Sequence, residues 1–156
     1  MPTVMERVIL LLVICIPGVH AADQTCPWLN AATAGGVLEG PVHSTVIKDG
    51  ENASCEFARQ NSADKLRIEI VTISASRGEL AAYKSQCVIP LTPLKAIGNE
   101  AVLCDIGTKS GGVAEQVAGR VRKRAFLVWM TSATFSRESL REKATKVAEQ
   151  IAGNLF

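Results

Sequence analysis

The sequence predicts a single α+β domain in which helices flank a mainly antiparallel sheet. Short β-forming runs follow one another with hairpin-length links. Capped segments with helical periodicity separate these runs and close the chain. The 156 residues, 47% of them hydrophobic, suit one domain. We therefore expect the element order α-β-β-β-α-β-β-β-α in a domain that spans residues 22–156.

Residues 1–21 are predicted to be a secretory signal peptide and not part of the fold. The apolar run Val8–Ile16 is followed by the helix-breaking pair Pro17-Gly18 and by the small residue Ala21. This run is shorter than the roughly 20 residues that a membrane-spanning helix needs. We therefore expect no transmembrane span after processing. Cys15 lacks the small preceding residues of a lipoprotein cleavage site, so it is interpreted as part of the apolar run.

The first half of the domain predicts one short helix and three strands. Asn30 is a good N-cap, and Gly40-Pro41 closes the helix that follows it. Asp49-Gly50 is a hairpin turn signal. Strict alternation of apolar and polar residues predicts that the third strand has one buried face. The predicted strands are residues 42–47, 53–58 and 66–73.

The second half predicts two helices with strands between them. Ser76 has capping-box spacing and opens a helix. Pro90 and Pro93 predict an extended connection. The predicted strands are residues 101–106, 116–122 and 125–131. Ser136 caps the last helix, whose charges cover one side and whose apolar stripe is Leu140, Ala144, Val147, Ala148, Ile151 and Leu155.

The cysteine count predicts two disulfides. Removal of residues 1–21 leaves four cysteines, and an even number in an exported chain indicates disulfide pairing. Spacing does not choose among the three possible connectivities. We favour the pairs between sequence neighbours, Cys26 with Cys55 and Cys87 with Cys104. A four-thiolate zinc site would need short Cys-x-x-Cys pairs, which the sequence lacks, so no metal or cofactor is predicted.

One basic segment is a candidate binding surface for an anionic partner. The net charge of +2 argues against a dedicated nucleic-acid binder. The segment holds Arg120, Arg122, Lys123 and Arg124, and its three arginines would share a face on an extended backbone. Such a stripe would attract phospholipid heads, teichoic-type phosphates or an acidic protein. The alternative is a solvated sheet face whose charges discourage edge-to-edge pairing. The large aromatic residues are assigned to the core, with Trp28 as an exception: Trp28, Phe57, Phe126, Trp129 and Phe135.

The residues do not form a recognisable catalytic motif. His43 is the only histidine left after processing, and the adjacent Ser44 would point to the opposite face of a strand. We favour a secreted or periplasmic non-enzymatic protein that binds a ligand or a protein partner at the cell envelope. One alternative is a small extracellular hydrolase or transferase whose site combines His43, Asp105 and a distant serine. Another is an inhibitor of an extracellular enzyme that presents the loop between Cys87 and Cys104.

Three stretches are similar to a known family. The run Leu29–Val42 after a cysteine, the turn Pro93–Ala101, and Ala125–Val128 before an amphipathic terminal helix resemble small exported actinobacterial cell-wall lipoproteins of unknown function. The resemblance implies the compact α+β fold of the Mog1/PsbP type, shared with extracellular sensor domains of some mycobacterial receptor kinases. It implies no catalytic residue. Relatives are often lipid-anchored, whereas this leader lacks a lipoprotein cleavage site.

Overall fold

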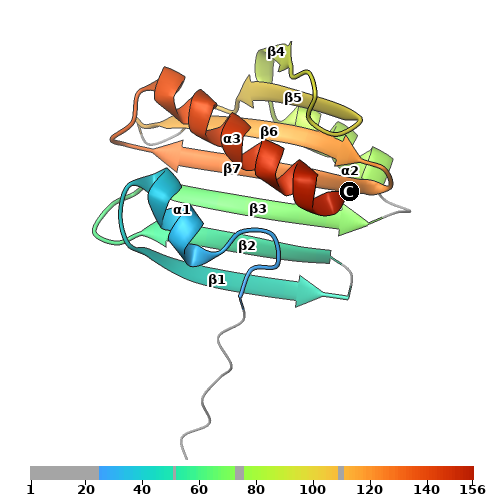
Figure 1. Cartoon of the computed structure of the whole chain (residues 1–156). Helices are drawn as coiled ribbons and strands as arrows, with labels where there is room; N and C mark the ends of the chain where they lie inside the picture. Colours follow the sequence, from blue (N-terminus) through green and yellow to red (C-terminus); the bar gives the residue numbers. More distant parts are fainter. Residues whose placement is uncertain (1–24, 51, 73–75, 109–110) are drawn as a thin grey trace, which may run out of the picture.

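The fold is an α+β sandwich built on one antiparallel sheet. The computed structural model describes residues 25–50, 52–72, 76–108 and 111–156, so the predicted signal peptide at 1–21 lies outside the described residues. The seven strands have the order β1-β2-β3-β7-β6-β5-β4, and neighbouring strands are antiparallel throughout. Helices α1 and α3 cover one face, and α2 lies on the other (Figure 1). The predicted fold class is confirmed.

Ten elements make up the described chain, and their order follows the predicted order with one added strand. In chain order they are α1 (Ala31–Leu38), β1 (Val42–Asp49), β2 (Asn52–Arg59), β3 (Lys65–Thr72), α2 (Ser76–Ser85), β4 (Val88–Pro93), β5 (Glu100–Asp105), β6 (Val113–Val121), β7 (Arg124–Ser132) and α3 (Arg137–Leu155).

The added strand is β4, at the edge of the sheet, where the sequence predicts an extended connection. Pro90 and Pro93 cannot donate backbone hydrogen bonds, and an edge strand tolerates this because one of its sides has no partner strand. The pairing of β4 with β5 is irregular between Val88 and Thr92. The prolines therefore keep the segment extended, as predicted, and the chain then pairs it with β5.

The main core lies between the sheet and the helices α1 and α3. Alternate residues of β3 and β7 point into it, including Leu66, Ile68 and Phe126. The predicted stripe of α3 is confirmed, because all of its members are buried there together with Ala152. A smaller cluster fills the space beneath α2, where Leu80 and Tyr83 meet residues of β5, β6 and β7.

The two disulfides join the predicted pairs. Cys26–Cys55 links the segment before α1 to β2, and its Cα atoms are 5.9 Å apart. Cys87–Cys104 links the connection between α2 and β4 to β5, and its Cα atoms are 5.5 Å apart. Both bridges tie a segment at the border of the sheet to a strand within it. Their presence is typical of proteins from oxidising compartments.

The aromatic residues divide into buried and half-buried groups. Phe57 and Phe126 are at most 1% exposed, as predicted. Trp129 and Phe135 pack against the core but are only partly buried, as Trp28 is, so the prediction holds for them in part. Among the described residues, no helix combines the length and apolarity needed to cross a membrane.

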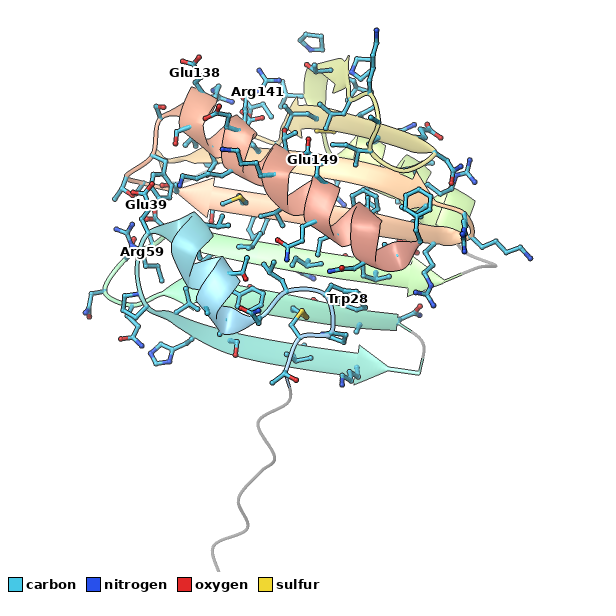
Figure 2. The ribbon with its side chains drawn as sticks, viewed as in Figure 1. Trp28, Glu39, Arg59, Glu138, Arg141 and Glu149 are labelled. Carbon is cyan, nitrogen blue, oxygen red and sulfur yellow. A yellow bond between two sulfur atoms is a disulfide. The ribbon has the colours of Figure 1, made fainter. Side chains whose placement is uncertain are left out.

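Asp64 joins the connection before β3 to the segment at the end of β7, at a corner of the sheet. Its carboxylate is completely buried and accepts hydrogen bonds from Ser132 Oγ at 2.7 Å, Thr134 Oγ1 at 2.7 Å and the backbone N–H of Ala133 at 3.1 Å. Arg59 Nη1 lies 3.1 Å from it and also donates to the carbonyl oxygen of Leu38. Arg59 therefore links this corner to the end of α1 (Figure 2).

Candidate functional site

The predicted basic segment forms the hairpin between β6 and β7. Val121 pairs with Arg124, so Arg122 and Lys123 are the two residues of the turn. Arg122 has a φ of 53°, and its backbone N–H donates to Asn99 Oδ1. The prediction that the three arginines share one face of an extended strand is therefore wrong. Arg122 lies in the turn and not in a strand. The alternation of side chains between the two faces of a strand therefore does not extend to it.

Arg120 points to the other side of the sheet from Arg124. Arg120 lies opposite Glu100 on β5, on the face that carries α2. Lys84 of α2 forms an ion pair with Glu100. The hydrogen bond from Lys84 holds the pKa of Glu100 below its usual range against the opposing effect of burial, and the charge of Arg120 adds to this. Arg120 thus faces an ionised carboxylate, and its Nη1 also donates to Arg122 O at 3.0 Å.

The turn residues and Arg124 surround a hollow at the end of α3. The hollow has a volume of about 460 Å³, and its other walls include Asn154 and Phe156. Arg122, Lys123 and Arg124 are exposed. The guanidinium of Arg122 lies 5.7 Å from the ring centroid of Phe156, within cation–π range. None of the side chains that line this hollow is acidic. We call Arg122, Lys123 and Arg124 the basic hairpin.

The basic hairpin lies at the carboxyl end of α3, where positive charge is favourable. The carboxyl end of a helix carries about half a negative charge, which favours cations nearby. The hairpin lies against that end of α3, since Asn154 and Leu155 share the hollow with it. The sequence has no acidic residue between Glu115 and Glu138. The three cations are therefore held together by the fold and remain open to an anionic group from solvent.

The alternative site around His43 does not assemble with Asp105. His43 is exposed on the edge strand β1, opposite Ala58. Asp105 lies on β5, with β2, β3, β7 and β6 between them. Five strand spacings put the two residues about 24 Å apart. Asp105 is moreover paired with Arg137 on the face covered by α3. The structure therefore does not bring together the two residues that this alternative combines.

The segment between Cys87 and Cys104 is folded into the sheet. It forms β4, the turn at 94–99 and β5, and Ile97 in the turn is only 3% exposed. Among its described side chains, the large apolar ones that are exposed are Val88 and Leu91 on β4, at 52% and 37%. The segment thus offers a strand edge, and not the projecting loop expected for an enzyme inhibitor.

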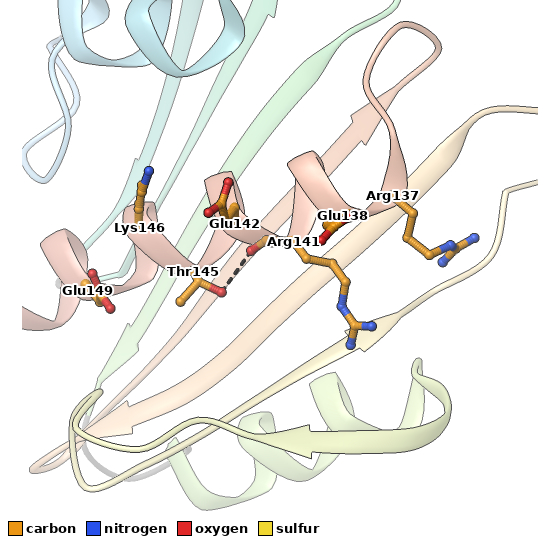
Figure 3. Close-up of a pocket in the computed structure, with 7 residues that line it drawn as sticks. All are labelled: Arg137, Glu138, Arg141, Glu142, Thr145, Lys146 and Glu149. Atoms are coloured by element: carbon orange, nitrogen blue, oxygen red, sulfur yellow. Dashed lines mark hydrogen bonds between the residues drawn. The ribbon is translucent and has the colours of Figure 1, made fainter.

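Sequence reasoning missed a buried ionic cluster at the beginning of α3. Glu115 on β6 is completely buried, with Arg137 Nη1 3.0 Å from Oε1 and Arg141 Nε 3.6 Å from Oε2. Burial raises the pKa of Glu115, against the lowering effect of the two arginines. Both arginines project from α3 to the same side, beside a hollow of about 630 Å³ along the helix (Figure 3). A charged residue within the apolar run of β6 is the sequence signal for this cluster.

This cluster anchors α3 to the sheet. Arg137 joins Glu115 on β6 to Asp105 on β5, and Arg141 Nη2 donates to Thr92 Oγ1 on β4 at 3.2 Å. The two guanidinium groups thus contact side chains on three strands, β6, β5 and β4. The remaining charged groups along the hollow are of mixed sign and include three carboxylates, Glu138, Glu142 and Glu149. The basic hairpin therefore remains the stronger candidate for binding an anion.

The chain has no match among the proteins compared with it. Comparisons with protein-family models, with curated proteins and with solved structures found none. The relationship to the exported actinobacterial cell-wall proteins therefore stays a prediction.

Proposed function

We propose that this protein is an exported, non-enzymatic cell-envelope protein that binds a phosphate-bearing anionic component through the basic hairpin. The observation that carries the proposal is the geometry of that hairpin. Three exposed cations border one hollow of about 460 Å³, and none of its lining side chains is acidic. Export is supported by the predicted signal peptide at 1–21 and by the two disulfides. The resemblance to exported cell-wall proteins supports the same location.

Phosphate groups suit the hydrogen-bond donors of this hairpin. Two arginines can each offer paired N–H donors to phosphate oxygens, and Lys123 adds a mobile positive charge. Phe156 is 63% exposed beside them and can contact the apolar part of an amphipathic ligand. Phospholipid heads and teichoic-type polymers share the phosphate chemistry. Binding should weaken as salt rises, because exposed charges are screened within about 8 Å at physiological ionic strength.

The test is a charge-neutral variant of the basic hairpin. Arg122→Gln/Arg124→Gln removes two cations from the hollow, and Lys48→Gln/Lys146→Gln removes two exposed cations elsewhere as a matched control. Cosedimentation with phosphatidylglycerol vesicles and with a soluble poly(glycerol phosphate) would measure binding at low salt. Each basic residue near an anionic surface contributes about 1 kcal/mol, so the hairpin variant should bind about thirtyfold more weakly.

The two probes separate the sources of phosphate. Binding to vesicles and polymer alike would indicate recognition of the phosphate itself, and binding to vesicles alone would indicate a lipid surface. In both cases the hairpin variant should lose affinity and the control should keep it. Equal binding by the hairpin variant and the wild type to both probes would overturn the proposal.

A further inference from the structure

A second surface with different chemistry lies on the face of the sheet that carries α2. This helix contacts β7, β6 and, to a smaller extent, β3, whereas α1 and α3, the other helices of the described residues, lie on the opposite face (Figure 1). Two hollows of about 390 and 470 Å³ lie on this face, and Trp129 and Gly107 line both of them. Each volume is within the range of small-molecule sites. We call the two adjoining hollows the tryptophan groove.

The side chain of Trp129 forms a wall of the tryptophan groove as well as part of the core border. It lies on β7, opposite Arg67 of β3 and Gln116 of β6, and packs at the border of the cluster beneath α2. The side chain is half-buried, so part of the indole faces the groove. The inner part is held by buried neighbours such as Leu127. The groove therefore has an aromatic wall that is packed against the core on its inner side.

Ion pairs hold the charged side chains of the groove in place. On β3, Arg67 pairs with Glu69, and Glu69 also accepts a hydrogen bond from Tyr83 Oη at 3.2 Å. Lys65 Nζ lies 3.2 Å from Glu56 Oε1 on β2. Each cation is thus balanced by a neighbouring carboxylate. The groove combines an aromatic wall with hydrogen-bond donors and acceptors whose cations are paired, Arg67 with Glu69 in the lining and Lys65 with Glu56 beside the groove.

We infer that the tryptophan groove binds an uncharged saccharide chain. Both cations of the groove are already paired with carboxylates, which argues against phosphate or nucleic acid, since these ligands need a surplus of unpaired cations. An extended peptide would find no free backbone ladder, because strands within a sheet use their N–H and C=O groups for one another. A purely apolar ligand would displace water from Arg67 and Glu69 without replacing the hydrogen bonds that this water makes. A neutral, hydroxyl-rich ligand meets none of these objections.

The chemistry of a sugar ring matches each part of the groove. The ring's C–H groups form an apolar face that can stack on the indole, whose π face is negatively polarised. Its hydroxyl oxygens can accept hydrogen bonds from the guanidinium of Arg67, and its hydroxyl protons can be donated to Glu69. The exposed side chains of Gln86 and Thr108 line the groove at its two hollows and supply further partners. No covalent step is involved.

The binding test uses the natural fluorescence of Trp129. The sequence has two tryptophans, so Trp28→Phe leaves Trp129 as the single reporter. This variant would be titrated with the β-1,4-linked tetramers of N-acetylglucosamine and of glucose, up to about 10 mM. We expect a saturable change in Trp129 emission with at least one of these neutral probes. No saturable change with either would overturn the inference.

Two further variants localise the binding. Arg67→Gln keeps a polar side chain at a 45% exposed position but loses the charge-assisted donors, and should weaken binding about tenfold by calorimetry. Trp129→Phe keeps a smaller ring in the wall and should weaken it as well. The hairpin variant Arg122→Gln/Arg124→Gln should bind the same saccharide as the wild type does. Unchanged affinity in Arg67→Gln and Trp129→Phe would place binding elsewhere and overturn the inference.

Discussion

Replacement of Asp64 by asparagine tests the corner that joins β3, β7 and α1. The asparagine side chain would keep the shape of the original one but lose its charge and one of its two acceptor atoms. Ser132 and Thr134 can rotate their hydroxyl groups to adapt. The backbone N–H of Ala133 and the guanidinium of Arg59 cannot, because both are obligatory donors. The asparagine variant should therefore lose mainly the contact with Arg59.

The magnitude follows from burial. Removal of one partner from a buried ion pair costs about 3 to 5 kcal/mol. Asp64 is completely buried, but the side chain of Arg59 is 22% exposed and can be partly rehydrated, so we expect a loss of about 3 kcal/mol. For a domain of this size, that loss lowers Tm by about 10 °C. The matched control is Asp105→Asn, whose carboxylate is 33% exposed and whose replacement should cost less than about 1 kcal/mol.

The pH dependence of stability distinguishes the loss of the Asp64 charge from a change in the shape of its side chain. Burial alone would raise the pKa of Asp64, but the hydrogen bonds from Ser132, Thr134 and its other donors outweigh it and lower the pKa below the ordinary value of 3.8. The stabilisation is therefore complete above that value and is lost as pH falls through the lower pKa of the folded state. In thermal unfolding followed by circular dichroism, the difference between wild type and Asp64→Asn should be largest at pH 7 and shrink below about pH 4. A difference that stays constant between pH 7 and about pH 3 would refute the reasoning.

Two glycine substitutions should change stability in opposite directions, as measured by urea unfolding. Gly119→Ala should lower the free energy of unfolding by about 1 to 3 kcal/mol, because the added Cβ would clash with the ring of the buried Phe126. Full stability in Gly119→Ala would contradict the packing of Phe126 on β6. Gly153→Ala should raise the free energy of unfolding by about 0.5 to 1 kcal/mol, because α3 has open space at that position and alanine favours the helix. A destabilised Gly153→Ala would contradict the placement of that residue.

Local patterns predict most of the fold. The alternation in β3, the caps at Asn30 and Ser136 and the stripe of α3 each depend on residues close in sequence, and the structure contains all of them. The even number of cysteines predicts two disulfides, and the favoured pairing of sequence neighbours is the one that forms, although spacing does not exclude the other two connectivities. The edge strand β4 is predictable only as extended backbone. Its pairing with β5 and its place at the edge of the sheet are contacts with another segment of the chain, which its own sequence does not encode.

The long-range contacts and the candidate sites are less predictable. The pairing of β3 with β7 brings Asp64 to Ser132, 68 residues away, and no local pattern indicates it. The neighbours of Arg122 favour extended structure, which is why the sequence predicts a strand there. The sequence does predict a tight connection near Lys123, but the register of Val121 with Arg124 places the turn at 122–123, one residue earlier than the predicted strand bounds. Hydrophobicity assigns Trp129 to the core, because it does not reveal that α2 leaves part of that face open.

The most direct test of this account is the covalent state of the protein isolated from its native host. Intact-mass analysis and non-reducing peptide mapping would report the N-terminus and the cysteine pairing together. An exported binding protein should begin at Ala22 and yield the linked peptides Cys26–Cys55 and Cys87–Cys104. A chain that still begins at Met1 and carries four alkylatable thiols in the mature region would contradict export, and with it the proposed role at the cell envelope.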